Sequence, residues 1–242
     1  MGDFIKGARY LLQGLKVLNT PGLRRYVVIP LSINTLLFSL LIYWLSSSVS
    51  SALDSLIGNF PEWLSFLYWI VMPAFMFILL FSSAYVFNII ANLIASPFNG
   101  ILAEKVETLA TGKTLESDSG MKQLLEIVPH SLAREFAKLR YYLPRVLALA
   151  LLTLIPVLNI IAPFAWFIWG AWMMAIQYVD YPMDNHQTHF SELKETVAQQ
   201  RLTSLGFGSS VVIALSIPIL NFIVMPAAVA GATLMWVEEY QQ

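Results

Sequence analysis

A short run of glycine and arginine before the first long apolar segment has the residue types of an anion-binding site. It reads Pro21-Gly22-Leu23-Arg24-Arg25. A helix N-terminus exposes N–H groups without partners and a partial positive charge, and guanidinium groups add charged donors for an oxyanion. Glycine lets the backbone approach a ligand closely. Paired arginines beside a spanning helix also anchor its topology, so anchoring is the competing explanation.

A stripe of polar side chains runs along the second long apolar segment and its extension, at three- and four-residue steps. Polar residues are costly in lipid, so the stripe should face other helices or water. It would serve equally as a pathway lining or as hydrogen-bonding glue between helices. Acidic groups at its mouth would repel a dianion unless a cation paired with them, and Arg134, Arg140 and Arg145 are candidates. The stripe comprises Asn88, Asn92, Ser96, Asn99 and Glu107, with Glu104 close to the same face.

A polar segment at residues 180–186 carries side chains that bind metals in other settings. Asp180, Asp184, His186 and the nearby His189 offer carboxylate and imidazole groups, but their spacing in a loop gives no fixed coordination geometry. We therefore expect no metal site. Asp184 or Asn185 is instead predicted to cap the helix that starts near residue 191.

The sequence contains no motif of a known catalytic, nucleotide-binding or metal-dependent site. The sequence contains no cysteine, no phosphate-binding loop, no hydrolase nucleophile elbow and no zinc-protease motif. The net charge is −1, which gives no basic field for a nucleic acid. We expect no catalytic residue, no cofactor and no nucleic-acid partner.

The composition indicates an all-α integral membrane protein. Hydrophobic residues make up 57% of the 242 residues and charged residues 12%, against about a quarter in soluble domains. Four stretches lack Asp, Glu, Lys and Arg: residues 26–53, 63–103, 146–179 and 202–237. About 20 apolar residues cross a bilayer, so the first two predict long transmembrane helices, over residues 22–57 and 62–110.

The third and fourth stretches each contain two prolines near the middle. A helix of about 34 residues would be about 50 Å long, too long for one crossing, while two crossings need about 40 residues plus a turn. The stretches at 146–179 and 202–237 therefore predict two re-entrant, proline-broken helical hairpins that enter and leave from one side. One kinked helix, or two strained crossings, remains the alternative for each stretch.

The two predicted hairpins resemble each other. Ile155-Pro156-Val157-Leu158-Asn159 in the first corresponds to Ile217-Pro218-Ile219-Leu220-Asn221 in the second. Proline removes a backbone donor, so Asn159 and Asn221 are predicted to satisfy freed backbone groups at the tips and to contribute to a pathway.

The polar flanks set the expected topology within a single membrane domain, residues 1–242. In residues 1–20 apolar side chains recur at three- and four-residue steps with polar ones on the other side, which predicts an amphipathic helix in the headgroup plane. Packing of this helix on the protein's own cytoplasmic face is the alternative. Residues 113–143 predict a cytoplasmic helical segment whose apolar face, including Phe136 and Leu139, packs on the bundle. Basic residues gather in the flanks and not in the loop after residue 53, so both termini should be cytoplasmic.

Several motifs together resemble the CysZ family of bacterial sulfate transporters. They are spread in order over almost the whole chain, which makes the resemblance more specific than any single motif. The matching segments are Gly22-Leu23-Arg24-Arg25, Ser96-Pro97-Phe98-Asn99-Gly100, Ala103-Glu104-Lys105-Val106-Glu107, residues 180–186 and the two Ile-Pro-x-Leu-Asn hairpins.

The resemblance implies sulfate uptake across the bacterial inner membrane for cysteine synthesis, through a homo-oligomer that includes a dimer. It assigns sulfate binding to Gly22, Leu23 and Arg24 with Arg25 beside them, and the family's Glu-x-x-Glu pair falls on Glu104 and Glu107. Because the glycine-arginine run is predicted on the cytoplasmic side, it would be an exit or regulatory site for imported sulfate. Channel and ion-coupled carrier both fit. A membrane adaptor without transport activity, or a membrane-embedded enzyme, are the alternative functions.

Overall fold

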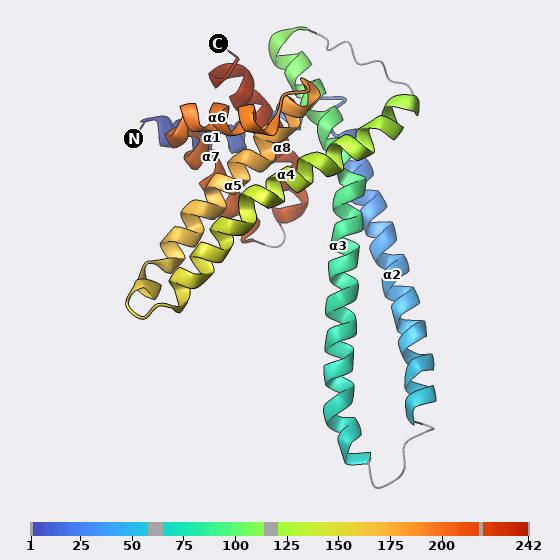
Figure 1. Cartoon of the computed structure of the whole chain (residues 1–242). Helices are drawn as coiled ribbons and strands as arrows, with labels where there is room; N and C mark the ends of the chain where they lie inside the picture. The colour runs from blue at the N-terminus through green and yellow to red at the C-terminus, as the bar shows by residue number, and fades with distance from the viewer. Residues whose placement is uncertain (1, 58–64, 114–120, 218–219, 242) are drawn as a thin grey trace. The chain divides into compact units, whose positions relative to one another are not determined.

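A computed structural model describes residues 2–57, 65–113, 121–217 and 220–241 (Figure 1). Side chains are described over these ranges except at positions 34, 45–57, 65–72, 75, 84–97, 121–133 and 222. Every regular element in the described ranges is helical, which confirms the all-α prediction. The elements are α1 (Gly2–Val17), α2 (Arg25–Ile57), α3 (Ser65–Thr111), α4 (Met121–Leu154), the 3-10 turn η2 (Leu158–Ile160), α5 (Ala162–Asn185), α6 (Phe190–Gln199), α7 (Arg201–Leu215) and α8 (Asn221–Glu239).

The chain divides into two compact units. The small unit is Arg25–Phe98, which holds α2 and most of α3. The large unit combines Met1–Arg24 with Asn99–Gln242 and holds the remaining elements, including the last turns of α3.

The small unit contains long helices with apolar side chains on their surface. In α2 the segment Arg25–Trp44 is, by length and hydropathy, the one described helix segment that could cross a membrane. Its side chains include Leu36 and Tyr43, which are 61% and 75% exposed. Most of the second predicted span has side chains outside the described residues.

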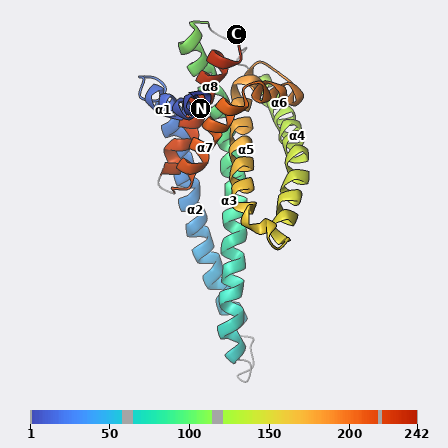
Figure 2. The same cartoon turned by 90° about the vertical axis from the view of Figure 1, so that its left-hand side faces the viewer.

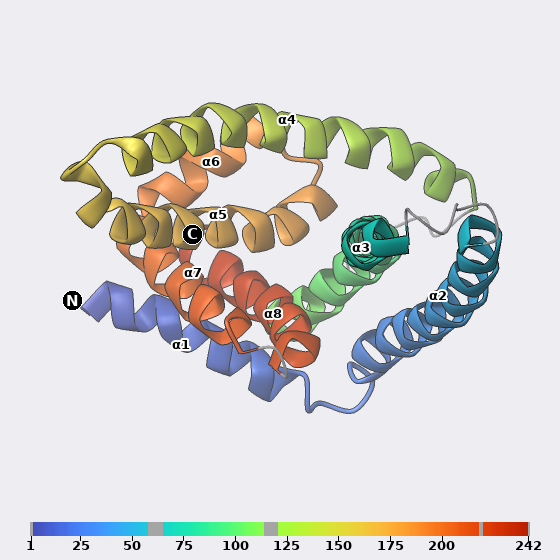
Figure 3. The same ribbon diagram turned by 90° about the horizontal axis from the view of Figure 1, so that it is seen from below.

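The large unit is built in layers around α5. Seen from below, α4 lies on one side of α5 and α7 with α8 on the other, while α1 packs against the outer side of α7 and α8 (Figure 3). The short helix α6 lies beside α5 and α4 (Figure 2). The core combines small and large apolar side chains, among them Ala175, Ile176 and Val179 of α5 and Phe207 of α7, each fully buried.

Helix α4 reverses through η2 into α5, so these two helices form a hairpin (Figure 1). The break falls at the predicted proline pair, since Pro156 lies in the turn and Pro163 in the first turn of α5. The hairpin end is apolar and exposed: Leu154, Val157 and Ile160 are 77%, 76% and 71% exposed. Helices α7 and α8 form a second hairpin, with α7 ending at Leu215 and α8 beginning at Asn221. Insertion of these hairpins into lipid stays a prediction.

The orientation of α4 differs from the expectation. The predicted cytoplasmic segment and the first arm of the hairpin are one continuous helix. Its apolar side chains Phe136 and Leu139 are 71% and 52% exposed, whereas Arg134 and Lys138 are buried. The prediction that the apolar face packs on the bundle is therefore wrong for these residues, because the cations find carboxylate partners on α5.

Helix α1 packs directly on the backbone of the second hairpin. A Cβ atom added to Gly206 of α7 would lie 2.0 Å from the carbonyl oxygen of Phe4, so only glycine permits this approach. Tyr10 and Leu11 are buried against α7 and α8, while Ile5 and Leu12 on the other side are more than half exposed. Helix α1 thus packs on α7 and α8 and leaves an apolar side uncovered, and its place in the headgroup plane stays a prediction.

The contact between α5 and α7 depends on Gly208 in the same way. A Cβ atom there would lie 1.8 Å from the carbonyl oxygen of Ala171, which would force the helices apart. We expect Gly208→Ala to destabilise the protein by more than about 2 kcal/mol. The control is Gly170→Ala, whose Cβ would meet only Val212 Cγ2 at 3.9 Å. The thermal midpoint of the detergent-solubilised protein measures the difference, and equal midpoints for the two variants would contradict this packing.

Candidate anion-binding turn and buried ion-pair network

The predicted glycine-arginine run forms a turn that ends where α2 begins. Gly22 has φ +96°, a backbone conformation that side chains rarely tolerate, and a Cβ atom there would meet nothing within 4 Å. The glycine is therefore required by backbone conformation and not by crowding. The N–H of Leu23 donates to the Thr20 carbonyl at 3.2 Å, and the Leu23 side chain is buried. Gly22 itself is exposed.

Arg24 and Arg25 are exposed cations whose described hydrogen bonds go to neutral groups. Arg24 Nη2 donates to the Asn19 carbonyl at 3.3 Å. Arg25 Nη2 donates to the Tyr26 hydroxyl at 3.0 Å, and its guanidinium carbon lies 4.9 Å from the Tyr26 ring centroid. Among the described residues no Asp or Glu makes an ion pair with either guanidinium group. Both groups keep N–H donors for an anion from solution.

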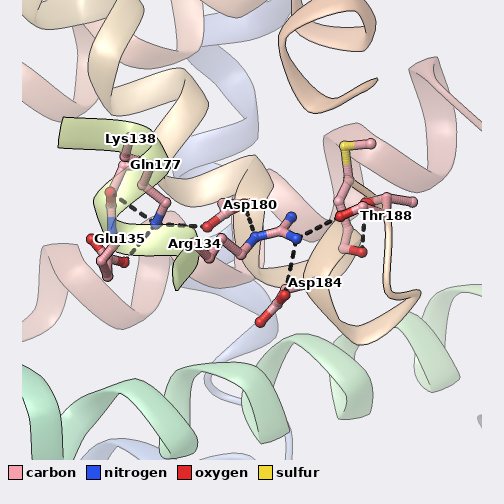
Figure 4. A network of polar contacts seen from close by, with 8 residues as sticks. Arg134, Glu135, Lys138, Gln177, Asp180, Asp184 and Thr188 are labelled. Carbon is pink, nitrogen blue, oxygen red and sulfur yellow. Dashed lines mark hydrogen bonds and ion pairs between the residues drawn. The ribbon is translucent and has the colours of Figure 1, made fainter. Parts of the chain in front are cut away.

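The large unit also contains a buried ion-pair network between α4 and α5 (Figure 4). Arg134 Nε lies 2.7 Å from Asp180 Oδ1, and Arg134 Nη1 lies 3.1 Å from Asp184 Oδ1 and donates to the Thr188 carbonyl at 2.5 Å. Lys138 Nζ lies 2.6 Å from Asp180 Oδ2. Asp180 thus uses both oxygens to hold two cations of α4.

Lys138 completes the network. Its Nζ also contacts Glu135 Oε1 at 2.7 Å and Gln177 Oε1 at 3.4 Å. Burial alone would lower the pKa of Lys138, but the charges of Asp180 and Glu135 outweigh it and hold the pKa above its ordinary value. Lys138 therefore stays charged, and carboxylates of the protein neutralise this charge.

A second polar cluster joins the last turns of α3 to the ends of α5 and α8. The buried Glu107 contacts His186 Nε2 at 2.8 Å and accepts from Gln241 Nε2 at 3.3 Å through one oxygen, Oε1. The His186 ring lies 4.6 Å from that of Trp236. Asn185 Nδ2 donates to the Gly100 carbonyl at 2.9 Å. These contacts fix the helix ends against each other.

Within the large unit, the described pathway residues Glu107 and Asn159 lie toward opposite ends of α5. Asn99, which like Glu107 belongs to the last turns of α3, donates to the Tyr181 hydroxyl at 3.2 Å. Glu104 pairs with Lys105 at 2.9 Å. Asn159 is exposed at the hairpin end, and α5 has 24 residues, so it lies about 36 Å from His186 along that helix. Asn221 begins α8, about 28 Å from Glu239 at the other end. The side chains of Asn88, Asn92 and Ser96 lie outside the described residues.

Sequence reasoning missed several partners in these clusters. Asp184 and Asn185 were predicted to cap a helix, but α5 continues through both and α6 begins with no side-chain cap. They bind Arg134 and the Gly100 carbonyl instead, because tertiary partners lie within reach. Of the predicted cations, Arg134 is buried in the network and Arg145 lies against aromatic rings. Among the described residues no group of three or more His, Asp and Glu side chains could hold a metal ion.

The C-terminal end of α8 holds α1 in place. Tyr10 donates to Glu238 and Glu239 at 2.8 and 2.6 Å, and Lys6 pairs with Glu239. Burial alone would raise the pKa of Glu239, but the hydrogen bonds from Lys6 and Tyr10 hold the pKa below its ordinary value. The carboxylate therefore stays ionised and ties α1 to α8.

Removing the charge of Asp180 should destabilise the large unit strongly. Asp180→Asn leaves two buried cations without their main partner, which costs about 3–5 kcal/mol. Glu135→Gln removes an equal charge from Lys138 at a side chain that is 61% exposed, so we expect a cost below about 1 kcal/mol. Thermal midpoints in detergent compare the two. A loss as large for Glu135→Gln as for Asp180→Asn would show that the buried carboxylate has no special role.

Comparison with known proteins finds close relatives over almost the full chain. A family model described as "Sulfate transporter CysZ/Etoposide-induced protein 2.4" matches residues 10–226. A protein named Sulfate transporter CysZ from Pseudomonas syringae pv. tomato is 47% identical over 235 residues, which cover 97% of this chain and 93% of the relative. Proteins of the same name from Pseudomonas fluorescens and Vibrio atlanticus are 46% and 44% identical, each over 97% of this chain and 94% and 93% of their own lengths.

Proposed function

This chain belongs to the CysZ family of sulfate transporters, and from that premise we propose that it carries sulfate across the bacterial inner membrane into the cytoplasm. The sulfate would supply assimilatory cysteine biosynthesis. The chain would act as a transporter and not as an enzyme.

Two exposed arginines that pair with no carboxylate among the described residues are the observation on which the sulfate site is proposed. Sulfate is a dianion, and a binding site for it needs positive charge that is not already paired. Arg24 and Arg25 meet this condition, and they follow the open turn at Gly22. We assign sulfate binding to Gly22, Leu23, Arg24 and Arg25, with the backbone supplying N–H donors and the guanidinium groups supplying charge.

The buried network is a poor first site for sulfate. Arg134 and Lys138 contribute two positive charges, and the carboxylates of Asp180 and Asp184 offset both. An incoming dianion would have to displace these carboxylates from a buried site, which is costly. We infer that the network positions α4 on α5, while sulfate meets the two exposed arginines.

The length of the first hairpin supports a re-entrant arrangement. From Arg145 to Leu154 helix α4 advances nine residues, or about 14 Å, close to half of the roughly 30 Å hydrocarbon core. Beyond Arg145 the hairpin exposes large apolar side chains, including Leu147, Leu151 and Phe164. A hairpin anchored at Arg145 would place Asn159 near the bilayer centre.

The remaining features of the transport route follow from this arrangement. The residues proposed to line the pathway are Asn88, Asn92, Ser96 and Asn99 of α3, with Asn159 and Asn221 at the hairpin ends. Glu104 and Glu107 would border the cytoplasmic end of the route. We further propose a multi-pass topology with both termini in the cytoplasm, and assembly as a homo-oligomer that includes a dimer.

Neutralising the two arginines should weaken sulfate binding strongly. A hydrogen bond to a charged group contributes about 2 kcal/mol, so Arg24→Gln/Arg25→Gln should weaken the affinity by at least about 30-fold. The matched control is Arg9→Gln/Lys16→Gln, which removes two exposed cations of α1. Radiolabelled sulfate binding to purified protein and sulfate flux into proteoliposomes are the measurements.

The two assays separate the proposed site from the proposed function. Unchanged binding and flux in the Arg24→Gln/Arg25→Gln variant would remove these residues from the account. Absence of sulfate flux with the unaltered protein, together with a co-purifying membrane protein, would favour the adaptor function instead.

A further inference from the structure

Helix α4 presents a row of cations and one tyrosine to its neighbours, and the row changes character along the hairpin. Arg134 and Lys138 meet Asp180 of α5. The next residues of the row, Tyr141 and Arg145, meet the rings of Trp172 and Trp169 instead. The row therefore starts with neutralised cations and ends, toward the apolar hairpin end, with Arg145, which lies against the rings of Tyr141 and Trp169.

A second cation comes to the same place from α6, which lies beside α4 and α5 (Figure 2). The Arg145 guanidinium carbon is 3.8 Å from the centroid of the Tyr141 ring, and Lys194 Nζ is 5.4 Å from it. Lys194 Nζ is also 5.5 Å from the ring of Phe190. Two positive charges thus converge on one tyrosine.

Neither cation has an acidic partner among the described residues. Glu192 and Glu195 lie on the same helix as Lys194, yet they form no ion pair with it or with Arg145. Arg145 is exposed, and its one hydrogen bond to protein goes from Nη1 to the Tyr141 carbonyl at 2.8 Å. Its other N–H groups are available to an outside acceptor.

Tyr141 adds a neutral donor between the two charges. Its hydroxyl oxygen accepts a hydrogen bond from Trp172 Nε1 at 3.2 Å. The hydroxyl hydrogen has no acceptor among the described residues, so it can be donated to an anionic oxygen. Arg145, Lys194 and Tyr141 together offer charged and neutral donors to one anionic group.

We propose that Arg145, Lys194 and Tyr141 bind the phosphate of an anionic phospholipid. The surroundings select a lipid over a free oxyanion: beyond Arg145 the hairpin exposes Leu147, Leu151 and Phe164, which suit acyl chains. Tyrosine and tryptophan beside basic residues are the composition of a membrane–water interface. The proposal rests on the hairpin insertion proposed above and assigns a lipid site that sulfate transport does not itself require.

Native mass spectrometry of the full chain with equal amounts of phosphatidylglycerol and phosphatidylcholine tests this site. The variant is Arg145→Gln/Lys194→Gln. Each cation near an anionic lipid contributes about a fivefold gain, so the affinity for phosphatidylglycerol should fall by about 25-fold while that for phosphatidylcholine stays the same. The control Lys16→Gln/Lys113→Gln removes two exposed cations that lie on neither α4 nor α6 and should keep the preference.

Further arms distinguish the source of the anion. The lipid assignment fails if the Arg145→Gln/Lys194→Gln variant retains the preference for phosphatidylglycerol. It also fails if millimolar sulfate or phosphate, but not chloride at equal ionic strength, displaces the lipid. Lys194→Arg preserves the charge and should preserve the preference; loss of the preference in this variant would overturn the charge-based assignment. The depth of a spin label at Val157 in liposomes, measured for every variant, reports hairpin insertion separately, so a failed lipid site and a failed hairpin proposal give different results.

Discussion

The pairing of Arg134 and Lys138 with Asp180 is the interaction on which the large unit depends. Two buried cations on one helix need carboxylates, and Asp180 supplies both of its oxygens from α5. A buried charge without a partner costs several kcal/mol, so α4 can pack on α5 only with its charged face inward. The apolar side chains of α4, such as Phe136 and Leu147, must then face outward. Charge pairing thereby decides which surface the hairpin offers to its surroundings.

That outward surface is suited to lipid. In water, exposed side chains such as Leu151, Leu154 and Val157 would lose the hydrophobic free energy that drives folding. In a bilayer the same side chains are solvated, and the paired charges stay inside. Cations that pair with no carboxylate in the described part of the chain lie elsewhere: Arg24 and Arg25 at the start of α2, and Arg145 beside Tyr141. Charge balance therefore distinguishes the three places: the structural network pairs its cations with carboxylates, whereas the proposed sulfate and lipid sites hold cations that remain available to an anion.

The sequence predicted local features better than tertiary partners. Proline positions indicated where α4 gives way to α5, because proline cannot continue a helix from its predecessor without losing a hydrogen bond. The pattern at Phe136 and Leu139 indicated a helix face but not its direction, since an apolar face points inward in water and outward in lipid. The pairing of Arg134 with Asp180 joins residues 46 positions apart, and no periodicity within one helix reports it. Gly22 was predicted for close approach, whereas its φ of +96° shows that the turn itself needs glycine.

The proposed transport route and lipid site both require that the apolar hairpin of α4 and α5 reaches the middle of the bilayer from one side. Spin labels at Val157, Leu147 and Arg140, placed one at a time in the protein in liposomes, measure this depth through their exposure to oxygen and to a water-soluble nickel reagent. The account predicts that Val157, at the hairpin end, is the deepest of the three, with Leu147 intermediate and Arg140 in water. A label at Val157 that is as accessible to the nickel reagent as one at Arg140 would contradict it.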